Sequence, residues 1–287
     1  MIFGGFGGAI CWCFGLMTFH GDLPPSPPTS LAFHGGEGGA VLGGQWCRVC
    51  SSVLWGVIVR ILLLADIHAN WPALAAIQER FDACLFLGDA VDYAADPAPC
   101  IDWLRRFATA AVRGNHDHSL AQRVRVRPAG TFRRISAALR EHHYRVLSGE
   151  HLTWLAELPV QQYVQLGEHR FLLLHATPRD PMDEYLEADP EQWRERLEGV
   201  QADFVCVGHT HVPMHLRLGA TQVVNPGSVG QPRDGDPRAS YAIIDRGQVE
   251  FRRVSYDVDR TVRQLRDAGL EPQVLAAAEW VLRSGGG

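Results

Sequence analysis

Short apolar runs alternate with helix-spaced apolar patterns from about residue 60 onward. Strands are expected where several consecutive residues are apolar, and helices where apolar positions recur every three or four residues. In chain order, the pattern predicts a strand, a helix, a strand, a helix, a short strand and a long helical region at residues 60–65, 71–80, 83–87, 97–107, 109–112 and 131–158. The helical region should end at Leu158, because Pro159 disfavours helical backbone in the residue before it.

The second half of the chain has a different rhythm, in which strands follow one another closely. Gly167 and Glu168 separate the apolar runs 162–166 and 170–174, which is the spacing of a two-residue hairpin. Further strands are predicted at residues 204–207, 215–218, 222–224, 241–245 and 249–256, and two amphipathic helices at 258–268 and 272–282. Strand–helix units followed by hairpins predict an α/β fold, a two-sheet sandwich flanked by helices, in a single domain over residues 59–287.

Residues 1–58 differ in composition from the rest of the chain. They hold 13 of the 29 Gly and four of the seven Cys, but only three charged residues. Cys47 and Cys50 have CxxC spacing, but a structural zinc site needs a second ligand pair, and none follows at a suitable distance. We expect an over-extended gene start, with Val59 as the true first residue; a disordered tail and a membrane anchor within residues 1–20 are the alternatives.

Composition and charge exclude several classes of protein. Hydrophobic residues make up 46% and charged residues 21% of the chain, as in globular proteins rather than disordered or polytopic membrane proteins. The 27 basic residues, all Arg, are outnumbered by 32 acidic residues, and the net charge of −5 provides no basic field for nucleic acid. Cys84, Cys100 and Cys206 are scattered and odd in number, which predicts reduced, packed thiols and a cytoplasmic location. The composition is also compatible with a homo-oligomer.

Side chains that can bind metal follow five of the predicted strands. They lie in the segments Asp66-Ile67-His68, Gly88-Asp89, Gly114-Asn115-His116-Asp117, His175 and Gly208-His209-Thr210-His211. A single Asp or Asn after a strand is usually a turn or helix cap, and a single His beside apolar residues is usually packed or solvated. Such groups at five strand ends have no shared structural cause, and strand ends are where α/β folds present side chains to ligands.

The types of side chain indicate the type of metal. Mixed imidazole and carboxylate ligands suit Mn, Fe or Zn, whereas Ca²⁺ and Mg²⁺ sites are nearly all oxygen. An aspartate can bridge two ions, and two ions ~3.5–4 Å apart can hold a hydroxide between them and neutralise a phosphoryl group. Glycine before Asp89, Asn115 and His209 would let the backbone approach the cluster without a Cβ clash. The sequence therefore predicts a centre of divalent or trivalent metal ions.

The series D-x-H, G-D, G-N-H-D, H and G-H-T-H, in this order, resembles the calcineurin-like metallophosphoesterases, and the resemblance runs from about Val59 to Tyr256. Within that superfamily the chain is most similar to small prokaryotic phosphoesterases grouped with diadenosine tetraphosphatases and with phosphatases similar to protein phosphatase 2A. Their recurrent segments appear here at residues 175–181 and 225–233. The resemblance implies an α/β/β/α fold and hydrolysis of a small phosphomonoester or phosphodiester substrate by attack of a metal-bridging hydroxide.

The resemblance also implies a role for individual residues. The metal ligands would be Asp66, His68 and His211 for one ion, and Asn115, His175 and His209 for the other. Asp89 would bridge the two ions. His116 would lie beside the leaving-group oxygen, with Asp117 orienting its ring. Arg233 is a weaker candidate for binding phosphate, with a surface ion pair as the alternative.

Two departures from the family pattern restrict the function. Protein Ser/Thr phosphatases and diadenosine tetraphosphatases of the superfamily carry G-D-x-V-D-R-G and G-N-H-E. Here Tyr93 stands in place of that Arg, and Asp117 in place of that Glu, which weakens the protein-phosphatase interpretation. The remaining alternatives are a nucleotide-directed hydrolase, acting on cyclic nucleotides or dinucleoside polyphosphates, and a metal-binding regulatory module without significant turnover.

Overall fold

Two five-stranded sheets form the centre of the computed structural model, which describes residues 60–286. The first sheet has the strand order β10-β9-β1-β2-β3. Its strands are β1 (Arg60–Leu64), β2 (Ala83–Phe86), β3 (Ala110–Ala111), β9 (Ala239–Asp245) and β10 (Gln248–Val254). β1 is parallel to β2 and antiparallel to β9, so the strand–helix units and the last hairpin meet at β1.

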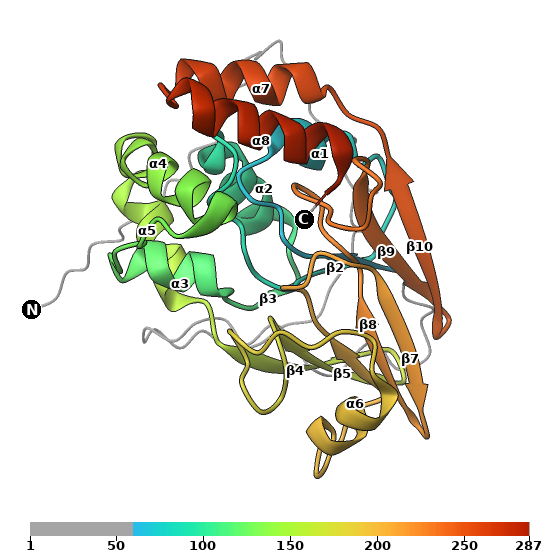
Figure 1. Ribbon diagram of the computed structural model, residues 1–287. Coiled ribbons are helices and arrows are strands. Elements are labelled where there is room, and N and C mark those ends of the chain that lie inside the picture. The colour runs from blue at the N-terminus through green and yellow to red at the C-terminus, as the bar shows by residue number, and fades with distance from the viewer. Residues whose placement is uncertain (1–59, 287) are drawn as a thin grey trace, which may run out of the picture.

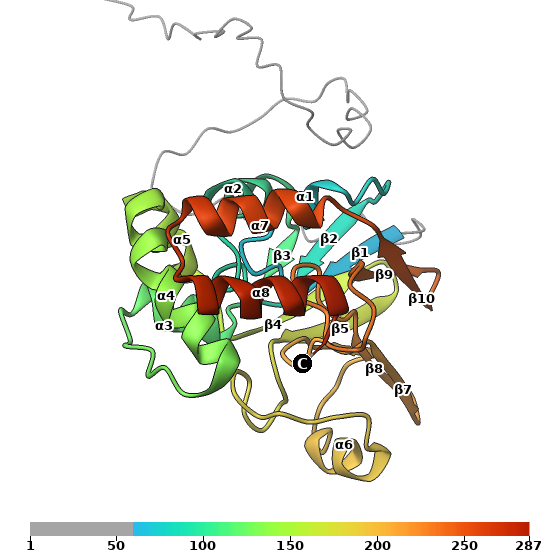
Figure 2. The ribbon, with the colours of Figure 1, turned by 45° about the horizontal axis from the view of Figure 1, so that its top comes forward.

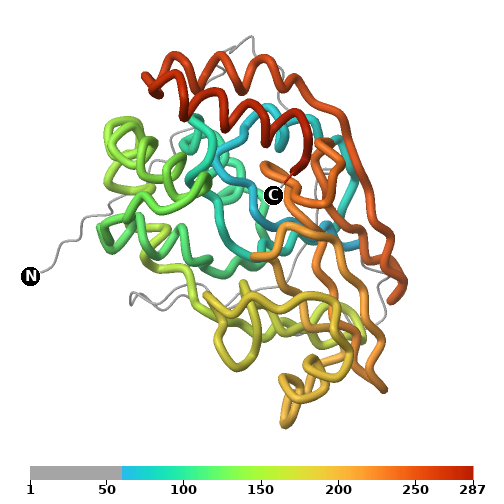
Figure 3. The backbone as a smooth tube through the Cα atoms, viewed as in Figure 1, coloured from blue at the N-terminus to red at the C-terminus, as the bar shows by residue number. Residues whose placement is uncertain are grey.

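The second sheet has the strand order β4-β5-β6-β8-β7. Its strands are β4 (Gln161–Leu166), β5 (His169–Leu174), β6 (Phe204–Cys206), β7 (Met214–Leu218) and β8 (Thr221–Asn225). β4 and β5 form the hairpin predicted at Gly167 and Glu168. Figure 3 follows the backbone through both sheets to the two C-terminal helices.

The sheets pack face to face, and β1 shows how the sequence specifies this. Successive side chains of a strand point to opposite faces. Ile61 and Leu63 belong to the apolar cluster between the sheets, whereas Leu62 and Leu64 belong to the cluster beneath the helices. Both faces of β1 are therefore buried, which explains an uninterrupted apolar run in place of alternation. Each such buried Leu or Ile contributes roughly 1.5–3 kcal/mol.

Helices cover the outer faces of the two sheets (Figures 1 and 2). They are α1 (Trp71–Ala75), α2 (Pro97–Phe107), α3 (Asn115–Ala121), α4 (Gly130–Val146), α5 (Gly149–Glu157), α6 (Pro190–Arg196), α7 (Val258–Asp267) and α8 (Pro272–Ser284). α7 and α8 lie side by side and pack on α1 and α4, whereas α6 packs against β7 at the other end of the molecule. The predicted two-sheet sandwich flanked by helices is confirmed.

The prediction of a continuous helical region over residues 131–158 is wrong in its middle. α4 ends at Val146, and α5 begins after Ser148. The Ser148 hydroxyl accepts a hydrogen bond from the His151 backbone N–H at 3.2 Å, which makes Ser148 an N-cap and starts a new helix. The predicted end at Leu158 is confirmed, because α5 ends at Glu157.

Three other elements differ from prediction. The helix expected over residues 71–80 ends at Ala75. After the helix the chain turns so that Ile77 is buried in the core. Five residues later the Asp82 N–H donates to Arg60 O at 2.8 Å, which aligns the chain with β1 at the start of β2. The short helices α3 and α6 were not predicted as helices, although Asp189 and Pro190 form a cap and first turn typical of a helix start.

Two further expectations concern the thiols and the first 58 residues. Cys84, Cys100 and Cys206 are buried, as predicted, and no two of them form a disulfide within residues 60–286. The predictions for residues 1–58, including Cys47 and Cys50, lie outside the described part of the chain. Between residues 60 and 286, no helix combines the length and apolar character that crossing a membrane requires.

Candidate metal centre and active-site cleft

The metal-binding side chains meet at the edge where the parallel strands β1 and β2 end. Asp66 follows β1 and Asp89 follows β2, and parallel neighbours bring such residues to one sheet edge. The two loops are tied together, since Asp66 N–H donates to Gly88 O and His68 N–H donates to Asp89 O, both at 3.0 Å. Both carboxylates are almost completely buried.

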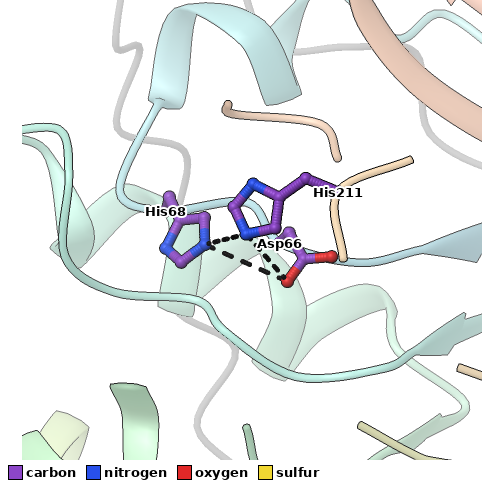
Figure 4. Close-up of side chains that lie close together, drawn as sticks. All are labelled: Asp66, His68 and His211. Carbon is purple, nitrogen blue, oxygen red and sulfur yellow. Dashed lines mark hydrogen bonds and ion pairs between the residues drawn. The ribbon is translucent and has the colours of Figure 1, made fainter. Parts of the chain in front are cut away.

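Asp66, His68 and His211 form the first group that could hold a metal ion (Figure 4). The Asp66 Oδ1 atom lies 3.9 Å from His68 Nε2 and 3.6 Å from His211 Nε2, and the two Nε2 atoms are 3.1 Å apart. His68 Nδ1 donates to Val91 O at 2.7 Å, and His211 Nδ1 donates to Gln231 O at 2.6 Å. These backbone bonds fix the rings and leave both Nε2 lone pairs facing Asp66, as is typical of metal-binding histidines.

Asp66, Asp89 and His175 form the second group. His175 Nε2 lies 3.2 Å from Asp89 Oδ2 and 4.0 Å from Asp66 Oδ1, and its Nδ1 donates to Leu87 O at 2.8 Å. Asp89 Oδ2 is also 3.8 Å from His68 Nε2 of the first group. Asp66 belongs to both groups, and Asp89, a member of the second group, also approaches a ligand of the first, so both carboxylates lie where they could contact two ions.

Asn115 and His209 lie beside the second group but are not part of it. The His209 ring is 5.0 Å from the His175 ring, centre to centre, while its Nε2 lies 3.3 Å from Asp183 O. Asn115 Oδ1 is buried and has no hydrogen-bond partner among residues 60–286. A buried amide oxygen without a partner costs free energy unless something binds it, and a cation would supply that partner. The donor set of carboxylates, imidazoles and this amide oxygen fits a divalent metal ion.

The electrostatics of the cluster also favour bound positive charge. Burial and the nearby Asp89 carboxylate raise the pKa of Asp66 to about 7, although His175 opposes this. Burial alone would lower the pKa of His175, but Asp89 and Asp66 raise it to about 10. In the metal-free protein, protons on these groups offset the buried carboxylate charge. A cation would displace these protons, so metal binding should release them.

The backbone at the cluster is strained. The φ angles of Asp66, His68, Asp89, His209 and His211 lie between 49° and 69°, a region that non-glycine residues rarely occupy. Each such residue costs on the order of 1–3 kcal/mol, and strain of this kind concentrates at functional sites.

The close approach expected of the motif glycines is confirmed. A Cβ on Gly88 would lie 2.6 Å from Gly114 N, and one on Gly114 would overlap Asp89 Oδ1. Only glycine allows these two loops to touch beside the metal groups.

His116 lies at the mouth of the site, but Asp117 does not orient it, and that expectation is wrong. Asp117 is the third residue of α3, and its carboxylate turns back to accept backbone N–H groups of Asp89, Ala90 and Gly114 at 2.8–3.2 Å. His116 Nδ1 instead donates to Asp92 Oδ2 at 2.6 Å. Burial would lower the pKa of His116, but the Asp89 and Asp92 carboxylates raise it.

Asp92 is a site residue to which the sequence analysis assigned no role. Its Oδ2 atom also accepts hydrogen bonds from Ser136 Oγ and Arg140 Nη2, each at 2.6 Å, and it is fully buried. The only sequence signal was its place three residues after Asp89 in the G-D-x-V-D segment; its partners on α4 come from a helix with no recognisable motif.

A cleft of about 620 Å³ opens beside the metal groups. Metal-site residues, aromatic residues and arginines line it: Asp89, Asn115, His116, His209, His211, Tyr93, Phe132, Tyr185, Arg125, Arg127, Arg133, Arg140 and Arg233. The Arg233 guanidinium lies over the Phe132 ring at 4.1 Å, and its Nη2 donates to Gln231 Oε1 at 2.9 Å. Within residues 60–286 it forms no ion pair, so the surface ion pair considered for Arg233 is absent from that region.

Known proteins confirm the class that this fold and cluster define. The profile of the calcineurin-like phosphoesterase superfamily domain matches residues 59–248. The chain belongs to this superfamily, and it is a metal-dependent phosphoric ester hydrolase.

Individual relatives agree with this assignment. An uncharacterized protein of Methanocaldococcus jannaschii is 30% identical over 230 residues, which cover 71% of this chain and 91% of the relative. The phosphodiesterase YfcE of Escherichia coli is 26% identical over 204 residues, which cover 66% of this chain and 88% of YfcE. A metallophosphoesterase structure from Sphaerobacter thermophilus is 33% identical, with a TM-score of 0.67, and the match covers 80% of this chain and all of that one.

Proposed function

We propose that the protein hydrolyses a small phosphomonoester or phosphodiester at a centre of two metal ions. The observation that carries this proposal is that one carboxylate, Asp89, reaches a proposed ligand of each ion, at 3.2 Å from His175 Nε2 and 3.8 Å from His68 Nε2. Asp66, His68 and His211 would hold one ion, and His175, His209 and Asn115 the other. Mn, Fe and Zn suit this donor set. When bound, such ions activate a water molecule and neutralise charge on the phosphoryl group.

The residues of the chain would then bind the ester and supply a proton. Arg233 lies in the cleft wall with no carboxylate partner among residues 60–286, and its planar guanidinium matches two phosphate oxygens. His116 Nε2 lies 3.2 Å from Tyr93 Oη and faces the same cleft, while its Nδ1 is held by Asp92. A proton on Nε2 can pass to the leaving oxygen as the P–O bond breaks, and general acids of this kind contribute typically ~10²–10⁴-fold.

The experiment is turnover of bis-p-nitrophenyl phosphate and p-nitrophenyl phosphate by the metal-free protein after addition of Mn²⁺, Zn²⁺ or Fe²⁺. We expect metal-dependent release of nitrophenolate from at least one ester, and its loss in Asp89→Asn. Metal binding without turnover of either ester would favour the regulatory module instead. The phosphodiesterase relative leads us to expect faster turnover of the diester.

A nucleotide-directed hydrolase is the second candidate, and the size of the cleft favours it. At about 620 Å³ the cleft is large enough for a nucleotide as well as a simple ester. Cyclic nucleotides and dinucleoside polyphosphates, assayed with the same metals, separate the two candidate functions.

We also propose a cytoplasmic location, since the three described thiols are unpaired as in reducing compartments.

A further inference from the structure

Three arginines line the cleft beside the metal groups and have no acidic partner among residues 60–286. Arg125, Arg127 and Arg133 are exposed and form neither an ion pair nor a side-chain hydrogen bond within the described residues. Arg233 is a fourth cleft arginine without an ion pair among residues 60–286, although its guanidinium donates to Gln231 Oε1, whereas Arg140 is held by Asp92. A row of unpaired guanidinium groups in one cleft is repulsive in the free protein, so its presence indicates an anionic ligand.

The local backbone explains how these side chains reach the cleft. Arg123 has a φ of 55°, which ends α3, and residues 124–129 then run without regular structure to the start of α4. Pro128 restricts Arg127 to extended backbone. Four consecutive residues of this segment, Val124 to Arg127, line the cleft, so the segment runs along its edge and brings both guanidinium groups to it. Arg133 adds a third guanidinium from the first turns of α4.

The charge of the side chains that line the cleft differs in sign from the net charge of the molecule. The chain carries a net charge of −5, yet five arginines and only two carboxylates, Asp89 and Asp183, line the cleft. Asp89 belongs to the metal centre, so Asp183 is the single acidic side chain left to oppose the arginines. A long polyanion needs an extended basic surface, which a molecule of net charge −5 does not provide. A positive cleft of about 620 Å³ suits a small anion instead.

We propose that the substrate carries at least one further phosphate group besides the phosphoryl group that reacts, and that Arg125, Arg127 and Arg133 bind it. The proposal rests on the function proposed above, because it takes the metal groups as the place of reaction. It narrows the substrate class from simple phosphate esters to compounds with two or more phosphates. Guanidinium groups suit this task because each can donate two parallel hydrogen bonds to phosphate oxygens.

The test compares the binding of inorganic phosphate and tripolyphosphate by calorimetry, using metal-free and Mn²⁺-loaded protein. The variant Arg125→Gln/Arg127→Gln/Arg133→Gln removes the three guanidinium groups that form the proposed arginine wall, and it is called the wall variant. The control Arg134→Gln/Arg145→Gln/Arg217→Gln removes the same charge from exposed positions that do not line the cleft. Chelation of Mn²⁺ by tripolyphosphate affects every chain equally and cancels in the comparison.

We expect tripolyphosphate to bind more tightly than phosphate to the wild type and the control, and the wall variant to lose about 10- to 100-fold in tripolyphosphate affinity. Phosphate affinity should change less than about threefold, because Arg233 and the metal groups remain. Equal tripolyphosphate affinity in the wall variant and the control would overturn the proposal. So would a loss seen only with a single-stranded oligonucleotide, since that would assign the wall to a polymer.

Turnover separates this proposal from the function on which it rests. Suppose that the wild type hydrolyses bis-p-nitrophenyl phosphate and the wall variant keeps its tripolyphosphate affinity. That result would refute phosphate binding by the three arginines and support the phosphoesterase function. Wall-dependent tripolyphosphate binding without turnover of any ester would retain the anion site and refute the phosphoesterase.

Discussion

Replacement of Asp92 by Asn tests whether one buried carboxylate controls the proton that His116 donates. Asp92 Oδ2 accepts hydrogen bonds from His116 Nδ1, Ser136 Oγ and Arg140 Nη2, each at 2.6 Å. Asn has nearly the same shape but no charge. The variant should therefore lower the pKa of His116, which the Asp89 and Asp92 carboxylates raise, and loosen the orientation of its ring.

The expected size of the effect follows from these contacts. A hydrogen bond to a charged group contributes roughly 1.5–3 kcal/mol, which corresponds to about 10- to 100-fold in rate if it is fully expressed in the transition state. The same change leaves the Arg140 guanidinium, only 7% exposed, without its carboxylate. Removing one member of a buried pair costs about 3–5 kcal/mol, and the amide oxygen of Asn should recover part of that. Unfolding must therefore be measured together with activity.

The assay is kcat for a series of phosphate esters whose leaving groups range from nitrophenolate to simple alkoxides. Nitrophenolate is stable without a proton, whereas an alkoxide needs one as it leaves. On alkyl esters Asp92→Asn should lose about 10- to 100-fold and His116→Ala about 10²–10⁴-fold, and both should lose much less on nitrophenyl esters, with bound metal unchanged.

Ser136→Ala is the matched control, because it removes one hydrogen bond from the same oxygen and keeps the charge and the contact with His116. It should lower stability slightly and leave the dependence on leaving group as in the wild type. Equal losses on good and poor leaving groups in Asp92→Asn, with metal retained, would refute the reasoning and leave His116 a positioning residue.

Three further predictions concern the metals, the loops and the effect of pH. Asp89→Asn should lose both metal ions by elemental analysis, whereas His68→Ala and His175→Ala should each lose one; two ions remaining in Asp89→Asn would exclude a bridging role. Gly114→Ala should lower metal content and thermal stability together, because its Cβ would overlap Asp89 Oδ1; wild-type values for both would contradict the close approach. Burial lowers the pKa of His143 to about 4, so the unfolded chain binds a proton between pH ~6.5 and ~4 that the folded chain does not, and stability falls as pH drops through that window. His143→Gln should reduce this slope by up to ~1.4 kcal/mol per pH unit in denaturant titrations, and an unchanged slope would show that His143 is not the group responsible.

The sequence predicted best the elements whose positions depend on hydrophobic periodicity and local turn residues. β1 is apolar on both faces because it lies between helices and a second sheet, and this produced a strong signal. The hairpin at Gly167 and Glu168 needed only local turn chemistry. The break at Leu147 was missed because residues 131–158 keep a helical apolar pattern across it, and only the Ser148 cap marks the new start.

The candidate metal ligands could be found because strand order constrains them. Asp66 and Asp89 follow parallel neighbours, so their proximity follows from topology without any knowledge of side-chain direction. His175 and His211 likewise follow strands or turns of the second sheet that reach the same edge.

Helix geometry explains why the prediction that Asp117 orients the His116 ring was wrong. Asp117 follows His116 directly in sequence, but consecutive residues of a helix point about 100° apart and cannot face each other. Because His116 lies in the first turn of α3, its Nδ1 partner must come from another segment, and Asp92 is supplied by the loop after β2. Ser136 and Arg140 reach Asp92 from α4 because residues four apart share one helix face. The same helix and the loop before it place Arg125, Arg127 and Arg133 in the cleft, so the α3–α4 region would both position the proposed proton donor and supply the proposed phosphate-binding arginines.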